Sequence, residues 1–216
     1  MKTIALVTQK GGTGKSSIAV SLAVAAAETG HNSYVLDLDP QGTSKNWFER
    51  RVADTPQVAA IEASQVERAL VALRQQEYDL VIIDTAGVDT PATISAMQAA
   101  DLCLIPARPS IADIEATRAT IASLTKLGKP FAFVLNQCPA GRSVRTSDAY
   151  RVLSLGGVVA AATLATRADH IDALATGQGV TERDPNGKAA AEVRELLKWL
   201  MNKMEGKTDD KKARVA

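Results

Sequence analysis

The sequence predicts an α/β domain in which a mostly parallel, twisted β-sheet is covered by helices on both faces. Three observations support this prediction. Short apolar or β-branched runs alternate along the chain with longer helical patterns. The apolar runs are nearly continuous, as expected for strands that are buried on both sides. The length of 216 residues is enough to bury a full hydrophobic core.

Taken in order, strands are expected at residues 3–8, 33–37, 58–62, 80–84, 102–106, 131–136 and 158–164. Helices are expected at residues 15–28, 43–51, 65–76, 91–99, 111–127, 147–153, 168–175 and 188–204. Gly30 follows the first helical pattern, and Gly128 with Pro130 follows the fifth, which are common helix-end signals. We expect one domain over residues 1–205 and a frayed tail over residues 206–216, because the tail is charged and poor in apolar residues.

Composition limits the classes of function. The formal net charge is only +1, so binding to nucleic acid would have to come from a local patch. The two cysteines, Cys103 and Cys138, make neither a disulfide framework nor a Cys-x-x-Cys motif. The first apolar run is too short for a signal peptide, and no run approaches the length of a transmembrane helix. These features favour a soluble cytoplasmic protein.

The most informative segment lies between the first strand and the first helix. It is rich in glycine and lysine and reads Gln9-Lys10-Gly11-Gly12-Thr13-Gly14-Lys15-Ser16-Ser17. In a phosphate-binding P-loop, glycines turn successive N–H groups toward the phosphates, and the helix N-terminus adds its dipole. We expect Lys15 to reach the terminal phosphates and the Ser16 hydroxyl to bind Mg²⁺. Gln9 replaces the first glycine of the G-x-x-x-x-G-K-[ST] pattern, and a second lysine, Lys10, stands beside it.

Two other strands end in carboxylates, which would reach the same edge of the sheet as the glycine loop. The second strand ends in Asp37-Leu38-Asp39-Pro40-Gln41-Gly42, and the fourth ends in Asp84-Thr85-Ala86-Gly87. We expect Asp39 to orient the attacking water and to belong to the metal site, with Asp37 behind it. Asp84 is expected to hold Mg²⁺, and Gly87 would let the backbone approach the terminal phosphate. Together these motifs predict a P-loop NTPase.

The same motifs resemble those of the ParA/MinD ATPases. Residues 10–16 are similar to the deviant Walker A motif of that family, with Lys10 as its signature lysine. Residues 37–42 are similar to its second acidic motif and residues 84–87 to its Walker B motif. The first strand opens the chain without a preceding helix-turn-helix, so the resemblance is to the short plasmid-type ParA partition proteins.

The resemblance implies a slow, Mg²⁺-dependent ATPase that forms a homodimer when ATP binds. In such a dimer, Lys10 of each subunit would cross to the phosphates of its partner. A cation supplied by the partner would stabilise the charge that spreads over the transferring phosphoryl group, as an arginine finger does.

The end of the sixth strand bears on the choice of nucleotide. Asn136 lies where GTPases carry Asn-Lys-x-Asp, but Pro139 replaces the aspartate that would accept hydrogen bonds from guanine. An amide can pair with the donor and acceptor edge of adenine. We therefore expect ATP, with Asn136 either contacting the base or capping its strand, and with Pro185 as a further nucleotide contact.

The resemblance also implies nonspecific DNA binding by the ATP dimer, association with the nucleoid, and positioning of a plasmid or other cargo. A ParB-like or ribbon-helix-helix adaptor would stimulate hydrolysis. Arg167 and Lys188 fall at the DNA-contact places of the family, and Arg142 and Arg145 would extend the patch. A few cations per subunit would give weak, salt-sensitive binding that a dimer strengthens. Each of these charges could also be an ordinary solvated one.

Three other interpretations stay open. A MinD-like membrane ATPase would need an anchor, but the stripe on the last helix suits docking on the core better, and residues 206–216 are too polar to insert. An iron–sulfur reductase would use Cys103 and Cys138, although neither has flanking glycines and both suit burial as small hydrophobes. A biosynthetic ligase of the dethiobiotin synthetase kind would normally lack Lys10.

Overall fold

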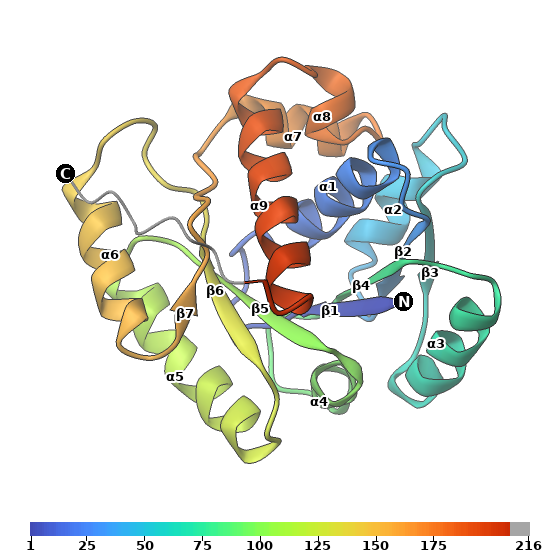
Figure 1. Cartoon of the computed structure of the whole chain (residues 1–216), viewed down its shortest axis with the longest axis horizontal. Coiled ribbons are helices and arrows are strands. Elements are labelled where there is room, and N and C mark those ends of the chain that lie inside the picture. Colours follow the sequence, from blue (N-terminus) through green and yellow to red (C-terminus); the bar gives the residue numbers. More distant parts are fainter. Residues whose placement is uncertain (208–216) are drawn as a thin grey trace.

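The computed structural model describes residues 1–207, so most of the predicted tail, residues 208–216, lies outside the described residues. Within residues 1–207, seven parallel strands form one sheet in the order β3-β2-β4-β1-β5-β6-β7 (Figure 1). The strands are β1 (Lys2–Leu6), β2 (Ser33–Asp37), β3 (Gln57–Ala60), β4 (Leu80–Asp84), β5 (Leu102–Ala107), β6 (Phe131–Leu135) and β7 (Val158–Val159).

Helices cover both faces of this sheet, as predicted (Figure 1). One layer contains α1 (Lys15–Glu28), α2 (Thr43–Glu49), α7 (Ala168–Ala175), α8 (Val180–Arg183) and α9 (Lys188–Met204). The other contains the short 3₁₀ turn η1 (Ala63–Gln65) and the helices α3 (Val66–Gln75), α4 (Pro91–Ala99), α5 (Ile111–Lys126) and α6 (Val144–Ser154).

The alternation of side chains along the strands builds two cores. On β1, Ile4 and Leu6 face the layer of α1 and α9, whereas Ala5 faces the layer of α3 to α6. Helix α1 lies at the centre of the first core, and every residue from position 18 to position 26 is buried. A helix packed on all sides holds the glycine loop at its N-terminus in a fixed place.

The end of α9 returns to the amino edge of the sheet. The Nζ of Lys2, at the start of β1, donates a hydrogen bond to the carbonyl of Met204 at 3.2 Å. The glycine loop follows the other end of β1, so residues 2 and 204 lie on the edge opposite the candidate site.

The largest differences from the sequence-based prediction concern β7, α6 and α8. β7 has two residues rather than seven. The backbone N–H groups of Ala160 and Leu164 still donate to the carbonyls of Phe133 and Leu135 on β6, but the residues between them do not continue the regular pairing. α6 starts at Val144 rather than at residue 147, since the side chain of Ser143 accepts a hydrogen bond from the backbone N–H of Thr146. α8, which spans four residues, is too short to give a periodic signal.

Candidate nucleotide-binding site

The glycine-rich loop turns sharply between β1 and α1. Gly12 and Gly14 have positive φ angles of 72° and 90°, a conformation that other residues rarely adopt. A Cβ atom on Gly14 would also overlap the side-chain amide of Asn136 at the end of β6. With the N-terminus of α1 behind it, a loop of this form offers backbone N–H groups to an anion.

Lys15 is the first residue of α1, and its side chain is buried. Burial lowers the pKa of the Lys15 ammonium, while the nearby carboxylates of Asp84 and Asp39 act in the opposite direction. A bound anion would stabilise a buried cation of this kind. The structure thus brings Lys15 together with both predicted carboxylates, from three separate parts of the chain.

The two acidic motifs meet because β4 lies between β1 and β2. Asp84 is in register with Leu6 of β1 on one side and with Asp37 of β2 on the other. The Asp37 carboxylate is buried and accepts hydrogen bonds from the backbone N–H groups of Asp39 at 3.0 Å and Lys45 at 2.9 Å. Asp37 therefore shapes the loop and the start of α2, whereas Asp39 is partly exposed and lines the cavity in front.

Asp84 provides the test of whether this site suits a metal ion. Its side chain is fully buried, its Oδ2 accepts a hydrogen bond from the Ser44 hydroxyl at 2.7 Å, and its Oδ1 has no hydrogen-bond partner. Burial raises the pKa of this carboxyl to about 7, with a further contribution from Asp37, while the nearby hydroxyls of Ser16 and Ser44 act in the opposite direction. A bare carboxylate oxygen next to a hydroxyl is an oxygen ligand set of the kind that Mg²⁺ prefers. The residues therefore fit a magnesium ion held by Ser16 and Asp84.

Lys15, Ser16 and Asp39 line a cavity of about 770 Å³, a size typical of a small-molecule site. Its walls are the glycine loop with the start of α1, and residues of segments 38–43 and 86–92. A Cβ atom on Gly87 would lie 2.8 Å from the backbone N and Cα of Gly11. The chain after β4 is thus pressed against the glycine loop, as the close approach predicted for Gly87 requires.

Lys10 lies on the other side of the glycine loop. Its Nζ donates to Oδ2 of Asp113 at 2.8 Å, and Arg108 Nε donates to Oδ1 of the same carboxylate at 2.9 Å. Burial would raise the pKa of the Asp113 carboxyl, but its three hydrogen-bond donors, Arg108 foremost, lower it to about 2. Lys10, Arg108 and Arg145 line a second cavity of about 570 Å³. Lys10 is thus held within its own chain, outside the 770 Å³ cavity.

Asn136 ties β6 to the glycine loop. Its Nδ2 donates to the carbonyl of Thr13 at 2.7 Å, and Nε2 of Gln137 donates to the carbonyl of Gly12 at 3.0 Å. Asn136 also lines a cavity of about 310 Å³ between α1, α7 and α9. Pro185 lies in the exposed loop between α8 and α9, apart from the residues that line these cavities.

The predicted DNA contacts do not share one environment. Lys188 is exposed at the start of α9, and Arg145 is exposed in the first turn of α6. Arg167 instead forms an ion pair with Glu192 of α9 at 2.6 Å, and only 19% of its side chain is exposed. Its guanidinium therefore takes part in the packing of α7 against α9.

The structure bears on two of the alternative interpretations. In α9, Val193, Leu196, Leu197 and Leu200 are buried in the core, which confirms that this stripe docks on the domain. No helix of the described residues is both long and apolar enough to span a membrane. Both cysteines are buried, and burial raises the pKa of the Cys103 thiol to about 12 and that of Cys138 to about 11.

Sequence reasoning missed two residues of the site, Ser44 and Asp113. Ser44 lies in the first turn of α2, and the inner face of a helix of seven residues cannot be recognised from its sequence pattern. Asp113 had a signal, because Ser110-x-x-Asp113 is a helix-start pattern, and the Ser110 side chain accepts a hydrogen bond from the Asp113 backbone N–H. That pattern does not show that the carboxylate would face Lys10.

A glycine loop, a buried lysine, a hydroxyl and an orphaned carboxylate at the carboxyl edge of a parallel sheet define a P-loop nucleotide-binding protein. More specifically, the chain belongs to the CobQ/CobB/MinD/ParA nucleotide binding domain family, which it matches over residues 4–212. This confirms the resemblance found in the motifs.

Known relatives agree with this assignment. The chain is 28% identical over 206 residues to Maintenance of carboxysome distribution protein A of Halothiobacillus neapolitanus, covering 90% of this chain and 94% of that protein. It is 30% identical over 156 residues to Chromosome-partitioning ATPase Soj of Thermus thermophilus, covering 59% and 63%. The fold matches that of the septum site-determining protein MinD of Pyrococcus horikoshii, complexed with Mg-ADP, with a TM-score of 0.76 at 19% identity over 96% of this chain and 99% of that one.

Proposed function

We propose that this chain is a dimeric switch ATPase that positions a plasmid or another cargo over DNA. On this proposal, residues 1–205 act as one domain that binds ATP and Mg²⁺, dimerises in the ATP state, and hydrolyses ATP slowly until a partner protein stimulates it. Family membership and the names of the relatives, which refer to partition and distribution, support the positioning role.

The observation that carries the proposal is the place of Lys10. It lies beside the glycine loop yet outside the cavity that Lys15 and Ser16 line, so a nucleotide in that cavity would leave it facing outward. A second subunit docked over the cavity would offer its own phosphates to this cation. Only a triphosphate would provide enough negative charge to bring two such lysines together at an interface.

Within one subunit, each residue has a distinct role on this proposal. Lys15 and the glycine loop hold the phosphates, and Ser16 and Asp84 hold Mg²⁺, which when bound neutralises charge between the phosphates. Asp39 lines the cavity and orients the attacking water. The Asn136 carbonyl oxygen, whose amide nitrogen is bonded to Thr13, would accept a hydrogen bond from adenine at the 310 Å³ cavity. Pro185, in the loop between α8 and α9, is a further proposed contact of the nucleotide.

The proposed DNA surface consists of Arg145, Arg167 and Lys188. The exposure of Arg145 and Lys188 supports them as phosphate contacts, and Arg167 would contribute only by leaving Glu192. Weak binding of this kind, doubled in a dimer, would place the ATP form on the nucleoid in the cytoplasm. A ParB-like or ribbon-helix-helix protein would be the adaptor to the cargo.

The test separates binding of ATP from dimerisation. Light scattering with a non-hydrolysable ATP analogue should show a dimer for the wild type and a monomer for Lys10→Ala, while Lys10→Ala still binds the analogue. Lys15→Gln should bind no nucleotide, because the phosphates lose their main cation. A wild type that stays monomeric with the bound analogue, or normal ATP turnover by Lys10→Ala, would refute the proposal.

A further inference from the structure

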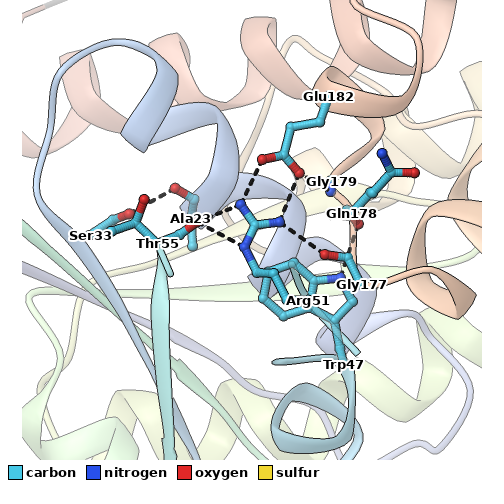
Figure 2. A network of polar contacts seen from close by, with 9 residues as sticks. All are labelled: Ala23, Ser33, Trp47, Arg51, Thr55, Gly177, Gln178, Gly179 and Glu182. Carbon is cyan, nitrogen blue, oxygen red and sulfur yellow. Dashed lines mark hydrogen bonds and ion pairs between the residues drawn. The ribbon is translucent and has the colours of Figure 1, made fainter. Parts of the chain in front are cut away.

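Helix α2 is fixed at its far end by a cluster of buried contacts that lies outside the nucleotide cavity (Figure 2). The cluster joins α2 and Arg51, two residues past the end of α2, to the segment 177–182, which follows α7 and contains most of α8. We call it the α2 clasp, and it consists of Trp47, Arg51, Gly177, Gln178 and Glu182.

Arg51 is the centre of the clasp, and all five of its N–H groups are bonded. Nη1 donates to the Glu182 carboxylate at 2.8 Å and to the Gly177 carbonyl at 2.9 Å. Nη2 donates to the same carboxylate at 2.6 Å and to the Thr55 carbonyl, and Nε donates to the Thr55 carbonyl at 2.8 Å. Only 3% of the Arg51 side chain is exposed. A lysine could not make this planar, forked set of bonds.

Trp47 fixes the same end of α2 through its ring. The ring is fully buried against Val20 and Val24 of α1, and its Nε1 donates to the Gln178 carbonyl at 3.0 Å. The Arg51 guanidinium lies 4.9 Å from the centre of the ring. Figure 2 shows the Trp47 and Arg51 side chains pointing toward the segment that contains Gly177, Gln178 and Glu182.

The backbone of the α7–α8 segment comes very close to α2. Gly177 has a φ angle of +67°, and a Cβ atom there would lie 2.6 Å from the backbone carbon of Arg50. Glu182 also accepts a hydrogen bond from the backbone N–H of Gly179 at 2.8 Å, which fixes the carboxylate that Arg51 uses. The segment and the helix end therefore pack as one unit.

The near end of α2 reaches the metal site. Ser44 donates to Asp84 at 2.7 Å, and the Lys45 backbone N–H donates to Asp37 at 2.9 Å. Helix α2 has seven residues, a length of about 10 Å. Because a helix this short moves as a rigid body, a shift at the clasp must appear at both carboxylates.

We propose that Arg51 and Trp47 are positioning residues for the metal site. Through α2, the clasp holds Ser44 and Lys45 against Asp84 and Asp37, and it couples nucleotide occupancy to the α7–α8 segment that leads into Lys188. Since such coupling is reciprocal, the segment also influences the affinity of the site for Mg²⁺–nucleotide. This inference rests on the proposed function only in taking the 770 Å³ cavity to bind Mg²⁺–nucleotide.

The test compares wild type with Arg51→Lys, which keeps the charge and loses the fork. Calorimetry should show binding of Mg²⁺–ADP weakened by about tenfold, a typical effect of removing support behind a metal ligand. In EDTA, both proteins should bind ADP equally, because the effect acts through the metal carboxylates. Mg²⁺–ADP should slow backbone hydrogen exchange of residues 177–183 in wild type, and this protection should be absent in Arg51→Lys.

Arg183→Lys is the matched control. It perturbs the ion pair between Arg183 of α8 and Asp172 of α7, at 3.1 Å, which does not involve α2. Both of its readouts should equal those of wild type. Trp47→Phe removes the Nε1 hydrogen bond and part of the buried ring but keeps the Arg51–Glu182 pair. It should give a smaller change in the same direction, and it serves as the test variant if Arg51→Lys does not fold.

Two results would overturn this inference and leave the proposed function standing. One is an Arg51→Lys variant with unchanged affinity for Mg²⁺–ADP and unchanged protection of residues 177–183 from hydrogen exchange. The other is a wild type that binds Mg²⁺–ADP without protecting these residues. A wild type that binds no Mg²⁺–ADP would overturn both.

Discussion

At the residue scale, Asp84 combines complete burial with a carboxylate oxygen that no donor reaches. Without a cation, such a group favours its protonated form, which is why its pKa lies at about 7. The neighbouring Asp37 has a pKa raised in the same direction, mainly by burial. Both carboxyls therefore favour the protonated form more than exposed aspartates do.

This leads to a prediction on pH and stability. Between about pH 4 and pH 7, folded Asp84 keeps a proton that the unfolded chain has released, so its contribution to the free energy of unfolding falls as pH rises, by up to about 4 kcal/mol. Urea unfolding in EDTA at about pH 5 and about pH 8 should show a smaller decrease for Asp84→Asn than for wild type. Equal decreases would mean that Asp84 is ionised without metal.

A second prediction concerns the restraint on Lys10. Asp113→Asn removes the charge that holds the Lys10 ammonium at 2.8 Å. Because a partly exposed ion pair contributes about 1 kcal/mol, we expect dimerisation with an ATP analogue to strengthen by about fivefold. Light scattering measures this. Asp148→Asn, which breaks an exposed pair with Arg151, is the control and should change nothing. Weaker dimerisation of Asp113→Asn would show that the contact assists the dimer.

At the scale of elements, the contact between the glycine loop and the chain after β4 depends on Gly87. Gly87→Ala would place a Cβ atom 2.8 Å from the Gly11 backbone, and overpacking costs about 1–3 kcal/mol. We expect affinity for Mg²⁺–ATP to fall by about tenfold, measured by calorimetry. Gly156→Ala is the control, since its Cβ atom would meet neighbours only at 3.5 Å or more. Equal affinity in both variants would contradict this account.

The elements also show what the sequence can and cannot predict. The convergence of the glycine loop, Asp39 and Asp84 was predictable, because each follows or ends a parallel strand, and parallel strands place their carboxyl ends on one edge whatever their order. The strand order and the two-residue β7 were not, since apolar runs report burial and not pairing. The α2 clasp could not be predicted from the sequence for another reason. Its members are 131 residues apart, and an arginine after a short helix looks like any solvated charge.

At the scale of the whole molecule, the net charge of only +1 means that any attraction to DNA must come from local groups of exposed cations. Arg145 and Lys188 are both exposed at the starts of helices, on separate elements that could face one DNA duplex. A dimer would present each of them twice. This doubling is what makes the expected DNA binding dependent on the nucleotide.

The corresponding prediction uses salt. Arg145→Ala combined with Lys188→Ala removes two cations per subunit, so the slope of log affinity against log salt for the ATP form should decrease by about 3 to 4. Fluorescence anisotropy with arbitrary duplex and an Asp39→Ala background, which should trap ATP, measures it. Arg68→Ala, which removes an exposed cation on α3 that is not part of the proposed DNA surface, should leave the slope unchanged. No binding of the trapped form at low salt would remove DNA as a ligand.

The hydrogen bond from Lys2 to Met204 has a practical consequence for such experiments. It places residues 2 and 204 together on the edge of the sheet opposite the candidate nucleotide-binding site. A fluorophore or a surface tether attached near either residue would report on the molecule without crowding the cavity, the Lys10 side or the clasp. Single-molecule observation of the switch could therefore use one attachment point at that edge for all variants described above.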